Sequence, residues 1–339
     1  MGHLEELNQL FVKWKNTSPT SITALSSNSG GPRLYFRLYY ENKSVIGAYS
    51  SDLRENKAFF YYTTFFRNAG VPVPELYYVD STSKYYFLED LGDLNLLSLL
   101  KSEGESIRIK KLYKNALSRL LEMQIHGGTH CNFEEFAYPR AEFDSQAILW
   151  DLNYFKYYFL KMTDIPFDEQ ALENDFEVLA KTISEMRGQN FMFRDFQARN
   201  IQIRNEEVWF IDYQGGRRGP MLYDIVSLLY QASANLSPRF RDELKGEYKQ
   251  AVLQKEIYVD ADFENDFHSI LFIRILQTLG TYGFRGLIEG KTYFKESIPL
   301  ALANLKNLIH SPEFNLEIPY FLELLEQILK YKSKFATNH

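Results

Sequence analysis

The chain has 339 residues, which is enough for two domains or for one domain with two lobes. Apolar residues make up 45% of it and charged residues 24%, so it is a globular chain and not a disordered one. The net charge of −6 argues against general nucleic-acid binding, and the single cysteine, Cys131, excludes an intramolecular disulfide and a thiolate metal cluster.

Membrane and secretion signals are not evident in the sequence. No stretch approaches the run of about 18 apolar residues that a membrane-spanning helix needs. The first 15 residues contain Glu5 and Glu6 and lack the apolar core of a signal peptide. We therefore expect a cytoplasmic protein without a membrane or nucleic-acid partner, and the oligomeric state stays open.

The first 91 residues are predicted to form a small, β-rich lobe. Apolar residues at helical spacing indicate helices, and runs of β-branched and aromatic residues between turn signals indicate strands. The predicted elements are, in chain order, a helix over 4–15, strands over 34–40 and 44–49, a helix over 52–68, and strands over 76–79 and 85–88.

Residues 92–339 are predicted to form a larger, mainly helical lobe. Long helical patterns cover 107–125, 145–162 and 169–186, and helices resume from Tyr223. Short apolar strands over 191–212 interrupt them. The order of elements predicts an α+β fold with two lobes.

The segment 193–212 contains the residues with the clearest chemistry. Asp195 is followed five positions later by Asn200, and Asp212 ends the second strand of a predicted hairpin. Because a hairpin brings its ends together, Asn200 and Asp212 are expected side by side, as hard oxygen ligands suited to Mg²⁺. Asp195 is suited to accept a proton from a hydroxyl nucleophile.

This pattern resembles the catalytic and metal-binding loops of the protein-kinase-like superfamily. Tyr213-Gln214 after Asp212 is closer to the small-molecule kinases of the aminoglycoside phosphotransferase and choline kinase group than to typical protein kinases. The segment 218–229 is similar to that group as well. The resemblance implies a bilobal kinase fold with ATP and Mg²⁺ between the lobes, and it implies that Asp224 braces the catalytic loop.

Within that group the chain is most similar to bacterial cell-wall amino-sugar kinases, which phosphorylate N-acetylmuramate and N-acetylglucosamine at the anomeric hydroxyl. The similarity is supported by the segments 69–74 and 87–93. It implies transfer of the γ-phosphoryl group of ATP to a hydroxyl of a small molecule, a sugar or amino sugar.

The resemblance also implies two nucleotide-binding segments. The hinge between the lobes would bind the adenine edge through its backbone, and a loop of small residues would let backbone N–H groups approach the phosphates. The implied residues are Leu88, Glu89, Asp90 and Leu91 of the hinge, and Ser29, Gly30 and Gly31 of the loop.

One departure from the family pattern concerns the lysine of the third strand, which holds the α- and β-phosphates in related kinases. Its expected position is occupied by Gly47, and its glutamate partner would be Glu55. Arg33, Arg37 or Lys43 could supply the positive charge, and the sequence does not choose between them.

Further candidates support the site. Arg199 is either a brace of the catalytic loop or a phosphate contact. Trp150, Asp151 and Asn153 lie on a predicted helix of the large lobe, where they either bind the acceptor or pack in the core.

Three alternatives stay open at this stage. An aminoglycoside kinase needs an acidic acceptor pocket, and a choline-type kinase needs an aromatic cage. A pseudokinase that binds nucleotide without turnover is favoured by the missing lysine and disfavoured by the intact set of Asp195, Asn200 and Asp212.

Overall fold

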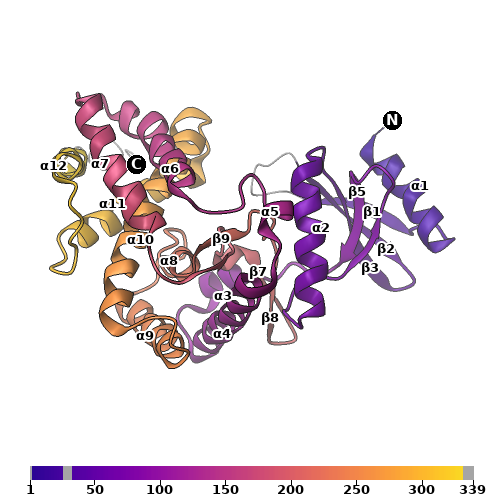
Figure 1. Ribbon diagram of the computed structural model, residues 1–339. Helices are drawn as coiled ribbons and strands as arrows, with labels where there is room; N and C mark the ends of the chain where they lie inside the picture. Colours follow the sequence, from indigo (N-terminus) through magenta and orange to yellow (C-terminus); the bar gives the residue numbers. More distant parts are fainter. Residues whose placement is uncertain (1, 26–32, 331–339) are drawn as a thin grey trace.

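The computed structural model describes residues 2–25 and 33–330. A five-stranded antiparallel sheet forms its N-terminal part (Figure 1). The strands are β1 (Ser21–Leu25), β2 (Leu34–Tyr40), β3 (Lys43–Tyr49), β4 (Leu76–Val79) and β5 (Tyr85–Glu89), in the order β1-β2-β3-β5-β4. We call this sheet, together with the two helices that cover it, the N-terminal lobe.

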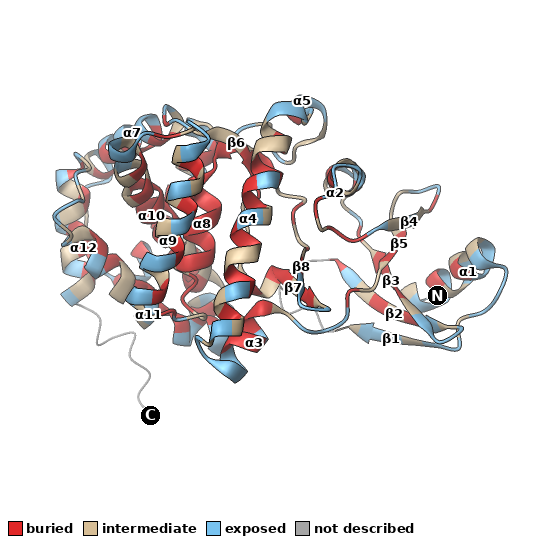
Figure 2. Cartoon of the chain, turned by 90° about the horizontal axis from the view of Figure 1, so that it is seen from below, coloured by how far each residue is buried: buried red, intermediate tan, exposed pale blue. Residues whose placement is uncertain are grey.

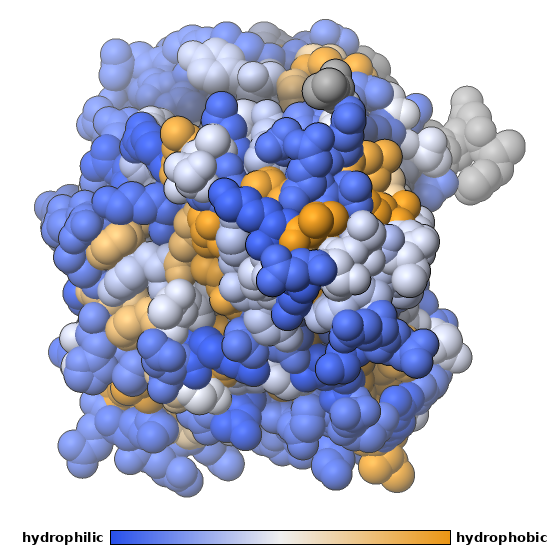
Figure 3. All heavy atoms as spheres, turned by 90° about the vertical axis from the view of Figure 1, so that its right-hand side faces the viewer, coloured by the Kyte–Doolittle hydropathy of each residue, from blue (hydrophilic) through white to orange (hydrophobic). Residues whose placement is uncertain are grey.

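The two faces of the sheet are covered by different helices. Helix α1 (His3–Lys15) buries Leu7 and Phe11 against the outer face, and the surface seen from that side is predominantly hydrophilic (Figure 3). Helix α2 (Leu53–Asn68) stands between the sheet and the helical part of the chain (Figure 1). Its N-terminus is capped by Asp52, whose side chain accepts hydrogen bonds from two backbone N–H groups.

The rest of the chain is mainly helical, and its buried residues gather on the central helices α4, α8 and α10 (Figure 2). All eight residues of α8 are buried. The helices are α3 (Leu96–Glu103), α4 (Ile107–His130), α5 (Phe133–Phe136), α6 (Ser145–Tyr158), α7 (Glu169–Ser184), α8 (Leu222–Leu229), α9 (Pro238–Gln254), α10 (Asp260–Tyr282), α11 (Thr292–Ile309) and α12 (Pro319–Lys330), with a π-helical turn at Gly283–Ile288.

Two short antiparallel strand pairs interrupt the helices. β6 (Gln189–Met192) pairs with β9 (Arg217–Pro220), and β7 (Ile201–Arg204) forms a hairpin with β8 (Glu207–Phe210). Backbone hydrogen bonds from Ile203 N to Leu94 O and from Phe210 N to Pro72 O join this hairpin to the segments that flank β4 and β5. The hairpin is thereby fixed against the N-terminal lobe.

The predicted fold class is confirmed: a β-sheet region is followed by a mainly helical region. The sequence did not predict β1, because its residues are mostly exposed and lack an alternating apolar face. The helix expected over 145–162 ends at Tyr158 and continues as a 3₁₀ turn at Leu160–Thr163. The lobe boundary at residues 91 and 92 stays a prediction, with β5 ending at Glu89 and α3 beginning at Leu96.

Among the described residues, no helix combines the length and the apolar character that crossing a bilayer requires.

Candidate active site

Asp195 lies in the loop between β6 and β7, between two arginine side chains. Its Oδ2 accepts a hydrogen bond from Arg199 Nη2 at 3.1 Å, and its Oδ1 accepts one from Arg274 Nη2 at 3.2 Å. Arg199 belongs to the same loop, whereas Arg274 comes from the middle of α10. Burial would raise the pKa of the Asp195 carboxyl, but the charges of the two arginines outweigh it and hold the pKa below its ordinary value. Asp195 is therefore ionised and held at both oxygens.

Asn200 and Asp212 are brought together by the β7–β8 hairpin. Asn200 Nδ2 donates to Asp195 O at 2.9 Å and to Asp212 Oδ2 at 3.3 Å, which leaves the amide oxygen of Asn200 for a cation. A backbone hydrogen bond from Ile211 N to Asn200 O closes the end of the hairpin. Asp212 has a φ of 73°, which costs free energy for a residue other than glycine and is often found at functional sites.

The electrostatics of Asp212 differ from those of Asp195. Burial, and then the negative charge of Asp195, raise the pKa of the Asp212 carboxyl. The described chain has no group of three or more His, Cys, Asp or Glu residues arranged to hold a metal ion. One carboxylate and one amide oxygen side by side suit Mg²⁺, which keeps several waters and is also bound by substrate phosphates.

Asp224, in the first turn of α8, holds the backbone of the loop 193–200 between β6 and β7. We call this segment, which contains Asp195, the catalytic loop. Its fully buried carboxylate accepts hydrogen bonds from Phe193 N at 2.8 Å, from Arg194 N at 2.9 Å and from Gln124 Nε2 at 2.8 Å. Arg194 has a φ of 81°, so these bonds fix a strained backbone position next to Asp195. Burial raises the pKa of Asp224 to about 7, and the hydrogen bonds to it act in the opposite direction.

Of the hinge residues Leu88, Glu89, Asp90 and Leu91, the first two are paired in the sheet as the end of β5, and the Glu89 backbone N–H donates to Glu75 O at 2.9 Å. The Asp90 carboxylate accepts hydrogen bonds from Arg37 Nε at 2.6 Å and Ser44 Oγ at 2.7 Å, and Glu89 forms an ion pair with Arg204 at 2.7 Å. Leu88 and Leu91 are buried. The polar side chains of this segment are thus already engaged. The loop prediction of Ser29, Gly30 and Gly31 lies outside the described residues.

The prediction that Gly47 occupies the position of the family's third-strand lysine is wrong. A Cβ at Gly47 would lie 2.8 Å from Leu38 Cδ1 and 3.1 Å from Leu7 Cδ2, so the position faces α1 on the outer side of the sheet. Because side chains alternate along a strand, its neighbours Ile46 and Ala48 face α2. A lysine that reached the nucleotide would therefore have to replace one of these two apolar residues.

The three candidate cations are in different surroundings. Arg33 forms an ion pair with Glu55 at 3.0 Å and is buried. Arg37 is bound to Asp90 and Asp93 through all three of its guanidinium nitrogens, and Lys43 is exposed at the start of β3. The structure thus brings Glu55 together with Arg33 alone among these three.

The predicted acceptor residues on α6 do not share one environment. Asp151 is buried, and its Oδ1 accepts a hydrogen bond from Arg194 Nη2 at 2.6 Å. Trp150 is 46% exposed, with the guanidinium of Arg140 5.4 Å from its ring centre, so it is not a core residue. Asn153 is partly buried. Asp151 therefore supports the catalytic loop through Arg194, the residue before Asp195.

Two residues of the site were missed by the sequence analysis. Arg274 binds Asp195 from 79 residues later in the chain, and Gln231 accepts a hydrogen bond from Ala198 N at 3.0 Å within the catalytic loop. Arg274 did leave a signal, because it is the one charged residue in the otherwise apolar run 270–276. A buried charge of this kind needs a partner, and here the partner is Asp195.

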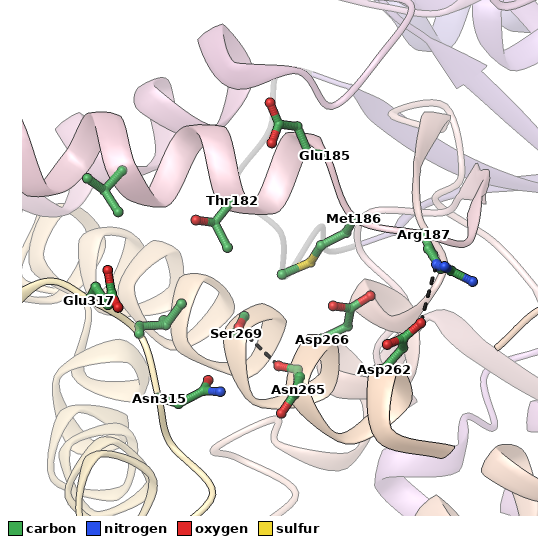
Figure 4. A pocket seen from close by; sticks show the side chains of 12 residues that line it. Thr182, Glu185, Met186, Arg187, Asp262, Asn265, Asp266, Ser269, Asn315 and Glu317 are labelled. Atoms are coloured by element: carbon green, nitrogen blue, oxygen red, sulfur yellow. Dashed lines mark hydrogen bonds and ion pairs between the residues drawn. The ribbon is translucent and has the colours of Figure 1, made fainter. Parts of the chain in front are cut away.

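A separate pocket of about 500 Å³ lies between α7 and α10 (Figure 4). Its polar lining includes the carboxylates of Glu185, Asp262 and Asp266, and Arg187 forms an ion pair with Asp262 at 3.3 Å (Figure 4). Burial, and then the charge of Asp262, raise the pKa of Asp266 to about 6. None of the catalytic-loop residues lines this pocket.

Comparison with protein families decides the kind of protein. The model of the phosphotransferase enzyme family matches residues 35–256, which include the hinge, the catalytic loop and Asp224. The chain belongs to this family. It is a small-molecule kinase.

Curated relatives and solved structures agree with this assignment. The chain is 24% identical over 246 residues to an N-acetylmuramate/N-acetylglucosamine kinase of Neisseria meningitidis, covering 70% of this chain and 71% of the relative. It is 23% identical over 315 residues to a kinase of the same name from Pseudomonas putida, covering 90% and 89%. The structure of an amicoumacin kinase with AMP-PNP, Ca²⁺ and amicoumacin has the same fold, with a TM-score of 0.62, 12% identity and coverage of 94% and 97%.

Proposed function

We propose that the protein transfers the γ-phosphoryl group of ATP to a hydroxyl group of an amino sugar of the N-acetylmuramate or N-acetylglucosamine type. The observation that carries the proposal is that Asn200 Nδ2 binds both the backbone oxygen of Asp195 and the carboxylate of Asp212, so that Asp195 lies beside the Asn200–Asp212 pair. The choice of acceptor is supported by the two curated relatives, which are named for these amino sugars.

In this reaction Asp195 accepts the proton of the acceptor hydroxyl. The hydroxyl oxygen forms a bond to the γ-phosphorus, the bond between that phosphorus and the β,γ-bridging oxygen breaks, and ADP leaves. Arg199 and Arg274 keep Asp195 ionised and bind its two oxygens, so the carboxylate is held in one orientation. Most of the rate enhancement comes from such positioning and from charge stabilisation.

Asn200 and Asp212 are the residues that would hold Mg²⁺. The fit rests on their chemistry: two adjacent residues with oxygen ligands, one of them a carboxylate whose pKa is raised by burial and by the negative charge of Asp195. A bound Mg²⁺ neutralises charge on the β- and γ-phosphates. Within the hinge segment 88–91, the backbone of Asp90 and Leu91 would hold the adenine edge, because Leu88 and Glu89 are already paired in β5.

The acceptor side of the proposal involves α6. Trp150 presents an exposed ring that can stack on a sugar face, and Asn153 lies three residues, about one turn, further along the helix. Asp151 is a positioning residue in this proposal, because its carboxylate is bound to Arg194.

The proposal is tested by measuring ADP release from Mg-ATP with a panel of acceptors. The panel contains N-acetylmuramate, N-acetylglucosamine, plain hexoses, choline and an aminoglycoside, and Asp195→Asn is the control. We expect stimulation by an amino sugar and its loss in the variant. Stimulation by choline or an aminoglycoside alone would contradict the amino-sugar assignment, and stimulation that survives in Asp195→Asn would contradict the role of Asp195.

A further inference from the structure

Arg33 has an unusual environment for a cation. Its side chain is 7% exposed, and Nη2 lies 3.0 Å from Glu55 Oε2 and 3.5 Å from Asn56 Oδ1. The other two guanidinium nitrogens, Nε and Nη1, are buried and have no well-formed hydrogen bond among the described residues, although the Tyr35 side chain is a close neighbour of the guanidinium. Buried N–H donors without an acceptor cost free energy, so this arrangement points to an acceptor that arrives with a ligand.

The position of Arg33 links it to the metal-binding loop. Its guanidinium lies 5.3 Å from the ring centre of Phe59 on α2, and Phe59 stacks on Tyr213 at 5.6 Å. Tyr213 directly follows Asp212, and the positive charge of Arg33 acts on the Asp212 carboxyl to lower its pKa against the larger effects that raise it. Arg33 therefore belongs to the same site as Asp212. It reaches this site from the N-terminal lobe.

The neighbouring cations are not available for this site. The guanidinium of Arg37 is engaged by the carboxylates of Asp90 and Asp93 through Nε, Nη1 and Nη2. Lys43 is exposed at the β2–β3 turn. Arg33 is the candidate that combines burial, an ion pair with Glu55 and two N–H donors without a well-formed hydrogen bond among the described residues.

We propose that Arg33 binds phosphate oxygens of the nucleotide through Nε and Nη1, while Glu55 holds its guanidinium in place. Nε–H and Nη1–H point to different sides of the guanidinium, so each would donate to a separate phosphate oxygen, and the permanent positive charge of arginine favours the anionic phosphate chain. Arg33 thus supplies, from the start of β2, the charge that related kinases supply from a lysine on β3. The inference rests on the proposed ATP-dependent function and assigns the residue that holds the phosphate chain.

Nucleotide binding without acceptor tests this directly. Dissociation constants for Mg-ATP, Mg-ADP and adenosine are measured by calorimetry for the wild type, Arg33→Gln and Arg33→Lys. The control is Arg119→Gln on α4, which removes an arginine whose side chain is 43% exposed and paired with Glu122. For Arg33→Gln we expect ATP and ADP to bind about tenfold or more weakly, with adenosine unchanged. Arg33→Lys should fall between, and the control should bind like the wild type.

Two results would overturn the proposal. One is unchanged binding of ATP and ADP by Arg33→Gln. The other is an equal loss of affinity for adenosine and ATP, which would mean that Arg33 only supports the fold of the lobe. If Arg33→Gln does not fold, as judged by its melting curve, Glu55→Gln carries the test: it removes the charge that holds Nη2, and it must weaken ATP but not adenosine.

Failure of this proposal and failure of the proposed function are distinguishable. A wild type that binds ATP but phosphorylates no amino sugar contradicts the acceptor assignment. The role of Arg33 is then still decided by the dissociation constants of the Arg33 variants for ATP, ADP and adenosine. A wild type that binds adenosine and ATP equally contradicts phosphate recognition by Arg33, whatever the acceptor panel gives.

Discussion

The two sides of the nucleotide site are built differently. On the helical side, Asp195 is held by two arginines, and Asp224 receives three hydrogen bonds that fix the loop. On the sheet side, Arg33 keeps two buried donors without a well-formed hydrogen bond among the described residues. The hydrogen bonds of the helical side are therefore already formed in the structure, whereas the proposed role of Arg33 implies that the nucleotide completes the sheet side. Substitutions on the catalytic side should lower turnover, and those on the sheet side should lower nucleotide affinity.

The largest effect on the catalytic side is expected from Asp195→Asn. The amide cannot accept the proton of the acceptor hydroxyl, so kcat should fall by about a thousandfold, within the usual contribution of a general base. Steady-state kinetics with saturating Mg-ATP measure it, and Asp242→Asn, an exposed acid on α9, is the matched control. A large loss of ATP affinity with unchanged turnover would contradict the expectation that substitutions on the helical side lower turnover and leave nucleotide affinity intact.

Asp212→Asn should have the next largest effect. Removing this carboxylate leaves Asn200 without its charged neighbour, so the Mg²⁺ concentration that gives half-maximal activity should rise by about tenfold and kcat should fall by about a hundredfold. A titration of activity against Mg²⁺ measures both numbers. Chelation of divalent cations should abolish the activity of the wild type. Activity that does not depend on a divalent cation would refute the metal role of Asn200 and Asp212.

Asp224→Asn tests how much the helical side depends on the hydrogen bonds that fix the backbone of the catalytic loop. The amide places a donor against the N–H of Phe193 or Arg194, which should cost about 1–3 kcal/mol of stability and lower kcat by about tenfold.

The same residue predicts a pH dependence of stability. The pKa of Asp224 is raised to about 7 in the folded protein, against about 3.9 in an unfolded chain. The folded state therefore binds the proton more tightly, and this contribution to stability is complete below the unfolded pKa and is lost as the pH rises through the folded one. Urea denaturation at several pH values should show a larger difference between the wild type and Asp224→Asn near pH 5 than near pH 8. The opposite order would contradict the burial argument.

Arg274→Gln should have the smallest effect of the four. It frees one oxygen of Asp195 while Arg199 holds the other, so kcat should fall by about tenfold or less and the KM for ATP should not change. Arg241→Gln, which removes an arginine stacked on Tyr230 at the C-terminal end of α8, is the control. A change in the KM for ATP with constant kcat would place Arg274 on the phosphate side of the site.

The sequence predicted the parts of the site that are local in the chain. Asp195, Asn200 and Asp212 lie within 18 residues, and a hairpin alone is enough to bring the last two together. Arg274 was not predicted, because it reaches Asp195 only through the packing of α10 against α8. The orientation of Gly47 depended on which face of the sheet α1 covers, which the strand pattern does not determine.

The sequence also did not predict the strand β1 or the ion pair between Arg33 and Glu55. β1 is an edge strand with little buried surface, so its pattern resembles that of a loop. Arg33 and Glu55 are separated by the β2–β3 hairpin, and their meeting depends on how α2 lies on the sheet.

The central claim is phosphoryl transfer to an amino sugar, and ³¹P nuclear magnetic resonance tests it most directly. The wild type and Asp195→Asn are incubated with Mg-ATP and N-acetylmuramate or N-acetylglucosamine, and the products are observed without a coupling enzyme. The account predicts a sugar phosphate resonance, coupled to the anomeric proton, that grows with ADP in the wild type and is absent in the variant. Formation of ADP and inorganic phosphate alone, with no sugar phosphate from either acceptor, would contradict it.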